Sequence, residues 1–424
     1  MPRRHRHRRF RRRPDGALHG DVAHRRPLAR FRDRPPCRRT PHRSDRGVRI
    51  ASAGDRPAPS RRLPRVDAGT HQPRPRLGET LTTLAPPTST FLHFVPAEGY
   101  VGDVIPFYHD GVYHAFYLRR RPGRGTSYGH ARSTDLVHWE ELPDAIDVGG
   151  PDDPDAVNCF TGCVIEKDGV GYLFYTGFAP GSKHFPRETT CLATSTDFIY
   201  WEKAPNNPIL TSDTQWYERD DWRDPFIFWH EEEGQYWMLM CARDRINPGP
   251  MCGCLGLAKS KDLKDWTVHP PLWKPNMIPA PECPDTFEAG GYQYLIYSLM
   301  ETRYRSAPSW DGPWTYEGPT ELIDGMRFYA AKCFHNGDRH LLAGWVSTHE
   351  GLTDNGKIEW GGHIGIVREL VPTPGGGLHV RAPQEVKDAF PKKVLDLDDA
   401  EPESHSPAWE RTAGGGNEFA DDAD

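Results

Sequence analysis

The segment KDGVGYLFYTG at residues 167–177 joins a polar turn to a short strand of aromatic and small residues. Its Asp-Gly step is a strong hairpin signal, because both residue types tolerate the left-handed backbone of a tight two-residue turn. The strand that follows is rich in the residue types that β-sheets favour. The same design recurs in HDGVYHAFYL (109–118), EEGQYWMLMC (232–241), AGGYQYLIYS (289–298) and NGDRHLLAGWV (336–346).

A second pattern follows four of these units and consists of a serine, a turn that contains aspartate, and an aromatic residue. Its copies are STDLVHW (133–139), STDFIYW (195–201), SKDLKDW (260–266) and the degenerate SAPSWDGPW (306–314). We expect the Ser and Asp side chains to hold a turn through backbone hydrogen bonds, and the Trp to cover the next strand.

Five turn-plus-strand units, about 50 to 65 residues apart, predict an all-β fold with a radial repeat, since propeller blades are four-stranded sheets of about this length. A β-sandwich would require a different spacing and no strict repeat. The sequence therefore predicts a five-bladed β-propeller over residues 88–390.

The two ends of the chain differ from this region in composition. Residues 1–87 are rich in Arg and Pro, and the first 50 residues carry a formal charge of +14 although the whole chain carries −6. We interpret them as a disordered leader, and residues 391–424 as an acidic disordered tail. A nucleic-acid-binding arm is the alternative for the leader; for the whole protein, the acidic remainder predicts no nucleic-acid partner.

Nothing in the sequence indicates export or membrane insertion. No apolar stretch follows the basic start as an export signal requires, and no run approaches the roughly 18 apolar residues of a membrane span. The nine cysteines show neither a disulfide framework nor zinc spacing. We therefore expect reduced thiols, a cytoplasmic location and no membrane partner, while the oligomeric state stays open.

Three acidic residues occupy similar positions, early in three different units. They are Asp103 in GYVGDVIPFYHDG, Asp224 in WRDPFIF and Glu282 in PAPECPDTFEAGG. Because the inner strands of a propeller converge on one channel, these side chains are expected to share a cavity. Clustered carboxylates suit either a divalent metal or glycoside cleavage by a carboxylate pair. Alternatively, each could cap a strand-entry turn.

The stretch WRDPFIFWH (222–230) places Arg223 and Asp224 among bulky aromatic residues. Charged groups in such surroundings require partners, because their desolvation is costly. A planar guanidinium group can donate several hydrogen bonds to carboxylates or hydroxyls. We expect the pair to bind a polar ligand, or alternatively to tie two blades together.

Several blocks, in order, resemble glycoside hydrolase family 32, the invertases, levanases, inulinases and related β-fructofuranosidases. WRDP and ECPD resemble two of the three catalytic motifs of that family, and the late RHLLAGWV resembles its Gly-Trp block. The other matching blocks are FTGC (160–163), YGHARSTDLVHW (128–139), RFYAAKCF (327–334) and GGHIGIVREL (361–370). The resemblance covers nearly the whole of the predicted propeller.

Three features depart from the family pattern. Its first motif, Trp-Met-Asn-Asp-Pro-Asn-Gly, retains only the aspartate, within Gly102-Asp103-Val104. The stretch FYLRRRPG (116–123) stands where the family has a Gln-bearing segment. Too few residues follow the propeller for the usual C-terminal β-sandwich, which we therefore expect to be missing. The catalytic acids are retained, and the first two departures bear on sugar specificity.

The resemblance implies a retaining hydrolase of β-fructofuranosidic bonds in sucrose-type or fructan-type substrates, with no metal or cofactor. Asp103 would be the nucleophile, Glu282 the acid–base catalyst, and Asp224 the group that binds ring hydroxyls. The implied substrate contacts are Arg223, Tyr128, Phe160, Thr161 and Tyr329, of which the last four could equally be packing residues. Three alternatives remain: an arabinofuranosidase or xylosidase, a fructosyltransferase, and a non-catalytic sugar-binding propeller.

Overall fold

The computed structural model describes residues 93–392, apart from residues 248, 318–319, 326, 351–352 and 354. The predicted leader, and all but the first two residues of the predicted tail, lie outside the described residues. The described part is almost entirely β-structure, as predicted, with the six-residue helix α1 (Gln384–Ala389) at its end. None of the helices in this part is both long enough and apolar enough to cross a membrane.

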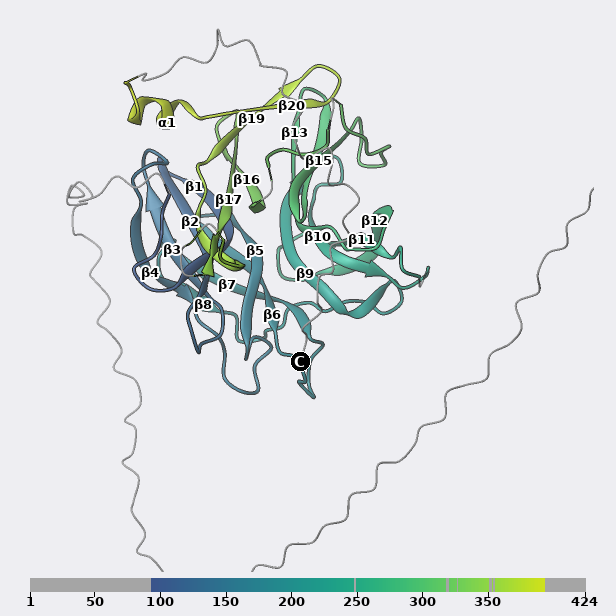
Figure 1. Cartoon of the computed structure of the whole chain (residues 1–424). Coiled ribbons are helices and arrows are strands. Elements are labelled where there is room, and N and C mark those ends of the chain that lie inside the picture. Colours follow the sequence, from purple (N-terminus) through teal and green to yellow (C-terminus); the bar gives the residue numbers. More distant parts are fainter. Residues whose placement is uncertain are drawn as a thin grey trace, which may run out of the picture. The chain divides into compact units, whose positions relative to one another are not determined.

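The strands form five antiparallel blades in chain order (Figure 1). Blades one and two contain β1 (Tyr100–His109), β2 (Val112–Arg120), β3 (Ser127–Ser133), β4 (Glu140–Ile146), β5 (Asn158–Lys167), β6 (Val170–Phe178), β7 (Glu188–Ser195) and β8 (Glu202–Lys203). Blades three and four contain β9 (Tyr217–His230), β10 (Gln235–Asp244), β11 (Gly253–Ser260), β12 (Thr267–Met277), β13 (Glu282–Ala289), β14 (Tyr292–Leu299) and β15 (Glu301–Ala307). Blade five contains β16 (Phe328–Asn336), β17 (Arg339–His349), β19 (Arg368–Thr373) and β20 (Gly377–Arg381).

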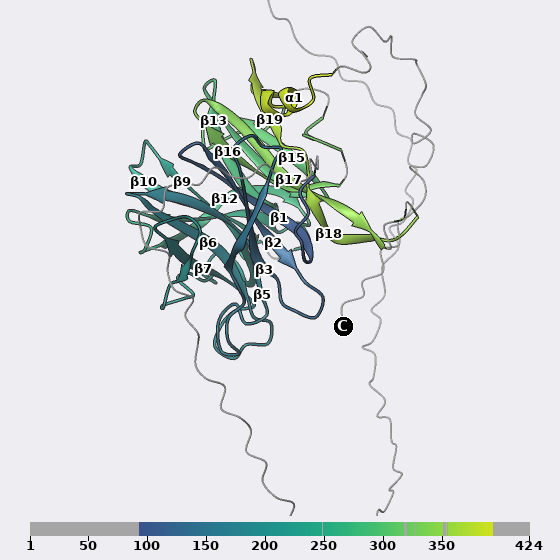
Figure 2. The same ribbon diagram turned by 90° about the vertical axis from the view of Figure 1, so that its left-hand side faces the viewer.

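The first strand of each blade lies innermost, and these strands contact one another in ring order from β1 through β5, β9, β13 and β16 back to β1. The remaining strand, β18 (Ile358–Ile364), pairs with β17 of blade five and with β1 of blade one. It lies beside β1 and β17 in the rotated view (Figure 2). The ring is therefore closed by pairing between the two ends of the propeller, which confirms the predicted five-bladed architecture.

The predicted hairpin turns have the expected backbone. Asp110 and Gly111 separate β1 from β2 with φ angles of 46° and 81°, and Asp168 and Gly169 separate β5 from β6 with 55° and 76°. Two successive positive φ angles are the mark of the type I′ turn, whose twist matches that of the flanking strands. Local sequence therefore sets the register of these hairpins.

Three copies of the Ser-Asp repeat form the same type of turn. In the first copy, the Ser133 hydroxyl donates to Asp135, whose Oδ1 accepts the backbone N–H groups of Val137 and His138. The second and third copies repeat these bonds around Asp197 and Asp262. The prediction of side-chain-held turns is confirmed.

The sequence predicted that the Trp of this repeat covers the next strand. In the structure, the Trp side chains of the second and third copies pack against the preceding blade instead. Trp201 of blade two meets Phe116 of blade one edge-on at 5.4 Å, and Trp266 of blade three meets Phe174 of blade two at 5.8 Å. Adjacent blades pack face to face, so the Trp that follows the Ser-Asp turn of one blade contacts the sheet of the preceding blade.

Within the described residues, the hydrophobic core forms five buried clusters, and each cluster lies mainly between two adjacent blades. The cluster between blades one and five, for example, joins Val101 and Tyr117 to Leu341 and Trp345. Burial of apolar surface, at about 25 cal/mol per Å², therefore stabilises the blade interfaces that hold the inner strands around the axis.

Candidate active site

All five inner strands interrupt their regular pairing at the same level of the propeller. Irregularities of this kind are β-bulges, which bend a strand and redirect its side chains, and they are frequent beside active sites. The interruptions fall between Val101 and Val104, Phe160 and Gly162, Arg223 and Phe226, Glu282 and Asp285, and Tyr329 and Lys332. The predicted acids therefore lie at bulges, where side chains can turn toward the axis.

Three of these bulges contain a non-glycine residue with positive φ. The angles are 59° at Asp224, 49° at Cys283 and 48° at Ala330. Such residues occupy the left-handed region at a cost in free energy, and they concentrate where function fixes the backbone. Surrounding structure enforces this geometry: the backbone N–H of Asp224 donates to Thr176 Oγ1 at 2.8 Å.

Asp103 on β1 is held by two donors from other blades. The Thr161 hydroxyl of blade two donates to its Oδ2, and Trp345 Nε1 of blade five donates to its Oδ1 at 2.9 Å. Burial raises the pKa of Asp103 to about 6; both hydrogen bonds oppose this rise, and the nearby Asp224 and Glu282 carboxylates add to it. The group is thus an oriented carboxylate that is ionised at neutral pH.

Asp224 is buried, and burial raises its pKa although Arg223 acts against the rise. Its Oδ2 accepts the backbone N–H of Cys283 at 2.9 Å. The Cys283 thiol lies 3.7 Å from Asp224 Oδ2 and also 3.7 Å from Asp103 Oδ2. Burial raises the pKa of this thiol well above its usual value, so it stays protonated as a weak donor between two carboxylates.

Glu282, the first residue of β13, is oriented through both oxygens. Its Oε1 accepts from Arg223 Nη2 at 3.0 Å, and its Oε2 accepts from the Tyr329 hydroxyl of blade five. Its side chain is about one-third exposed (36%), whereas that of Asp224 is 6% exposed. A proton donor to a substrate oxygen requires this combination of fixed orientation and access.

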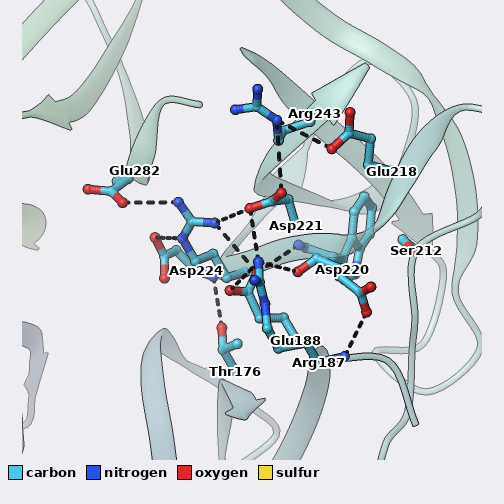
Figure 3. A network of polar contacts seen from close by, with 12 residues as sticks. Thr176, Arg187, Glu188, Ser212, Glu218, Asp220, Asp221, Asp224, Arg243 and Glu282 are labelled. Atoms are coloured by element: carbon cyan, nitrogen blue, oxygen red, sulfur yellow. Dashed lines mark hydrogen bonds and ion pairs between the residues drawn. The ribbon is translucent and has the colours of Figure 1, made fainter. Parts of the chain in front are cut away.

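Arg223 connects the acids of this site. Its guanidinium lies 3.0 Å from Glu282, 3.1 Å from Asp221, 3.5 Å from Glu188 and 3.9 Å from Asp224. Figure 3 shows these four carboxylates arranged around one guanidinium group. The sequence pointed to Asp224 as its partner, but the shortest distance is to Glu282 of the next blade. Arg223 therefore links blade three to blades two and four, as the blade-linkage interpretation expects, while ligand binding by the pair stays a prediction.

A cavity of about 590 Å³ opens over these groups. Asp103, Asp224 and Glu282 all line it, so the structure brings the three acids together as the sequence predicted. Its remaining lining is Leu118, Arg120, Arg124, Thr126, Asn158, Phe160, Thr161, Glu188, Arg223, Cys283, Tyr329 and Trp360. The volume is in the range of small-molecule sites.

The predicted substrate contacts divide into two groups. Arg223, Phe160, Thr161 and Tyr329 line the cavity. Tyr128 does not: it is fully buried, and its hydroxyl donates to the Phe160 carbonyl oxygen at 2.7 Å. The expected direct contact of Tyr128 with sugar is therefore wrong. Its position on strand β3, outside the inner ring, makes it a packing residue beneath the site.

Several site residues were missed in the sequence. Trp345 stands in the Gly-Trp block quoted above, and Cys283 directly follows Glu282, so both had a local signal. Glu188 and Trp360 had no local signal in the sequence, because their roles depend on neighbours in other strands. Glu188 is buried and accepts the backbone N–H of Trp222 at 3.0 Å; burial also raises its pKa.

Trp360 accounts for one departure from the family's first motif, the glycine at position 102. A Cβ placed on Gly102 would lie 2.3 Å from the Trp360 ring, closer than packed atoms approach. Glycine at 102 therefore makes room for an indole on the cavity wall. Within the part of the chain that the structure describes, no group of three or more His, Cys, Asp or Glu side chains is arranged to hold a metal ion.

A five-bladed propeller that carries acids from three inner strands in one cavity has the architecture of a propeller glycosidase. Residues 93–381 match the family model described as glycosyl hydrolases family 32 N-terminal domain. The chain therefore belongs to glycosyl hydrolases family 32.

Individual relatives agree with this assignment. The chain is 31% identical over 314 residues to a sucrose-6-phosphate hydrolase of Escherichia coli, and 30% identical over 318 residues to a raffinose invertase of the same species. Each alignment covers 67% of this chain and 62% of the relative, so the chain spans about three fifths of their length.

A solved structure supports the fold. The sucrose-6-phosphate hydrolase from Lactobacillus gasseri superimposes with a TM-score of 0.59 at 24% identity, over 70% of this chain and 64% of that chain.

Proposed function

We propose that this protein is a retaining glycoside hydrolase that cleaves β-fructofuranosidic bonds in sucrose-type or fructan-type substrates. The observation that carries the proposal is the convergence of Asp103, Asp224 and Glu282 in one cavity. The names of the two E. coli relatives, a sucrose-6-phosphate hydrolase and a raffinose invertase, agree with a fructoside substrate.

In the first step, the Asp103 carboxylate attacks the anomeric carbon of the fructosyl unit and forms a glycosyl–enzyme ester. The bond to the departing oxygen breaks, and Glu282 supplies the proton to that oxygen. In the second step, Glu282 removes a proton from water, which attacks the anomeric carbon and releases fructose and the Asp103 carboxylate. This double displacement is the retaining mechanism of carboxylate-pair glycosidases.

The surroundings of each acid suit these roles. Thr161 and Trp345 fix both oxygens of Asp103. Within the described residues, Asp224 uses only Oδ2 for its hydrogen bonds, so its Oδ1 is available to accept bonds from ring hydroxyls. Such bonds strengthen as positive charge develops on the ring, because hydroxyl donors then become more acidic and the low-dielectric site strengthens electrostatic attraction.

The test is a product assay with sucrose, inulin and levan, using Asp103→Asn as the inactive control. We expect fructose release by the native protein and none above background by the variant. In aqueous methanol, the methyl fructofuranoside formed should have the β configuration, which indicates retention. Cleavage of an aryl arabinofuranoside, with no fructose released from any of the three substrates, would refute the proposal.

Transfer of the fructosyl unit is distinguished in the same assay. A hydrolase releases free fructose in proportion to glucose from sucrose, whereas a transferase forms new linkages and leaves free fructose behind glucose. The first half-reaction is the same for both, so the ratio of the two products decides between them.

A further inference from the structure

Two charged residues of the inner strands, Asp285 and Lys332, are buried and have no part in the mechanism described above. They are 0% and 1% exposed. Both line a second cavity, of about 280 Å³, whose lining comes from all five inner strands, and neither lines the active-site cavity. Burial of charged groups is costly, so a contribution to the structure has to offset it. Any role of the pair in the reaction is indirect, because neither side chain reaches the cavity that would hold the substrate.

Each of the two side chains binds the backbone of the other strand. Asp285 on β13 accepts the backbone N–H of Cys333 on β16 through its Oδ2, at 2.8 Å. Lys332 on β16 donates from Nζ to the carbonyl oxygen of Pro284 on β13, at 3.0 Å. In the described part of the chain, β13 and β16 belong to different sheets, so their relative height depends on side chains. These two reciprocal bonds fix one strand against the other.

The buried pair and the catalytic acid share two bulges. The regular pairing of β13 is interrupted between Glu282 and Asp285, and that of β16 between Tyr329 and Lys332. At one end of these bulges the Tyr329 hydroxyl donates to Glu282, and at the other end lie the reciprocal bonds of the buried pair. A non-glycine residue inside each bulge has a positive φ, 49° on β13 and 48° on β16. Such conformations persist only where surrounding contacts enforce them.

The charges of Asp285 and Lys332 stabilise each other. Burial raises the pKa of Asp285 to about 7, and the Lys332 ammonium opposes this rise. The ammonium also lies 5.2 Å from the centre of the Phe226 ring of blade three, within the range of a cation–π interaction. Removal of one partner leaves an unpaired buried charge, whereas removal of both charges together is far less costly. The pair is therefore a single unit that can be neutralised as a whole.

We propose that Asp285 and Lys332 are positioning residues, which hold the bulges of blades four and five at the height at which Tyr329 orients Glu282 for proton transfer to the departing oxygen. A shift of β13 against β16 would separate Glu282 from Tyr329 and leave Arg223 as its remaining partner. Misplacement of a reacting group by about 1 Å can cost about a hundredfold in rate. This inference rests on the proposed hydrolysis of fructosides.

The kinetic test uses two fructosides that differ in their need for a proton. The glucosyl oxygen of sucrose has to be protonated as it leaves, whereas 4-nitrophenyl β-fructofuranoside releases a phenolate that leaves with its electron pair and without a proton. The variant Asp285→Asn/Lys332→Met removes both charges and keeps an acceptor for the Cys333 N–H. We expect kcat/KM for sucrose to fall about thirtyfold and kcat/KM for the nitrophenyl fructoside to fall less than about threefold. An equal fall for both substrates, or no fall for either, overturns the proposal.

Two further proteins test whether the effect acts through the contact between Tyr329 and Glu282. Asp244→Asn/Lys274→Met is the matched control, because it makes the same changes in an ion pair of 2.6 Å in blade three, away from the active-site cavity. It should leave the ratio of the two kcat/KM values unchanged. Tyr329→Phe should change the ratio in the same direction as the buried-pair variant, and the combination of both should add nothing further, because residues that act through one contact are not additive. A changed ratio in the control, or a fully additive combination, contradicts the proposal.

Crystal structures of the native protein and of Asp285→Asn/Lys332→Met separate this inference from the proposed function. In the variant, the Tyr329 hydroxyl should no longer lie within hydrogen-bond distance of Glu282. Such a separation supports the positioning role even if the native protein cleaves neither fructoside, in which case only the proposed hydrolysis fails. An unchanged contact overturns the positioning role. Thermal unfolding verifies that each variant is folded, and Asp285→Asn/Lys332→Gln, which keeps a neutral donor in the interior, replaces the first variant in both tests if that protein does not fold.

Discussion

Replacing Asp103 by asparagine is expected to remove turnover and, at the same time, to stabilise the fold above pH 6. Burial raises the pKa of Asp103 from an ordinary 3.8 to about 6. Ionisation of Asp103 therefore costs more free energy in the native protein than in the unfolded chain. Asparagine fits the same contacts, since its oxygen can accept from Trp345 and its amide can donate to the Thr161 oxygen.

The direction of the pH dependence follows from proton binding. Below pH 3.8, Asp103 is protonated in both the native and the unfolded state, so its ionisation does not lower the free energy of unfolding. Between pH 3.8 and 6 the native state binds more protons than the unfolded state, so stability falls as pH rises. Above pH 6 both states are ionised, and the full cost remains. Asparagine does not titrate, so the difference in the free energy of unfolding between the variant and the native protein increases from pH 3.8 to pH 6.

The magnitude follows from the two pKa values. A difference of about two pH units, at about 1.4 kcal/mol per unit, corresponds to about 3 kcal/mol. This is an upper value, because Asp103 is partly exposed and solvent screens its charge. The substitution should therefore raise the free energy of unfolding by 1 to about 3 kcal/mol at pH 8 and by little at pH 4.

The assay is urea unfolding of both proteins at several pH values from 4 to 8. Asp168→Asn is the matched control, because it changes the same groups at an exposed hairpin turn where asparagine accepts the positive φ. For the Asp168→Asn control, the change in the free energy of unfolding should not increase between pH 4 and pH 8. A gain for Asp103→Asn that is equal at pH 4 and pH 8, or a loss at pH 8, would refute the reasoning.

Three further predictions concern the neighbours of this carboxylate. For the native protein, kcat/KM should fall below about pH 6, and Trp345→Phe, which removes a donor to Asp103, should move this acid limb upward by about one pH unit in a pH–rate profile. Gly102→Ala should displace Trp360 and raise KM for sucrose severalfold more than it changes kcat. Arg223→Lys should lower kcat/KM for sucrose about a hundredfold, because one ammonium cannot replace the guanidinium fork, and an effect below threefold would contradict this role.

Local sequence determined the parts of this protein that depend on residues close together in the chain. The Asp110-Gly111 and Asp168-Gly169 steps specified two-residue hairpins, and the Ser-Asp repeat specified turns held by their own side chains. The spacing of these units predicted five blades. The physical reason is that turn geometry and strand alternation are set by steric and hydrogen-bonding preferences within a few residues.

Only the tertiary structure decided how the acids are held. Asp103 and Trp345 lie 242 positions apart, and their bond exists because β18 and the clusters between blades close the ring. The same closure buried Tyr128 beneath the site, although its motif position suggested a sugar contact. Side chains far apart in sequence meet only after the blades pack, so their partners, burial and pKa values are properties of the closed ring rather than of any segment.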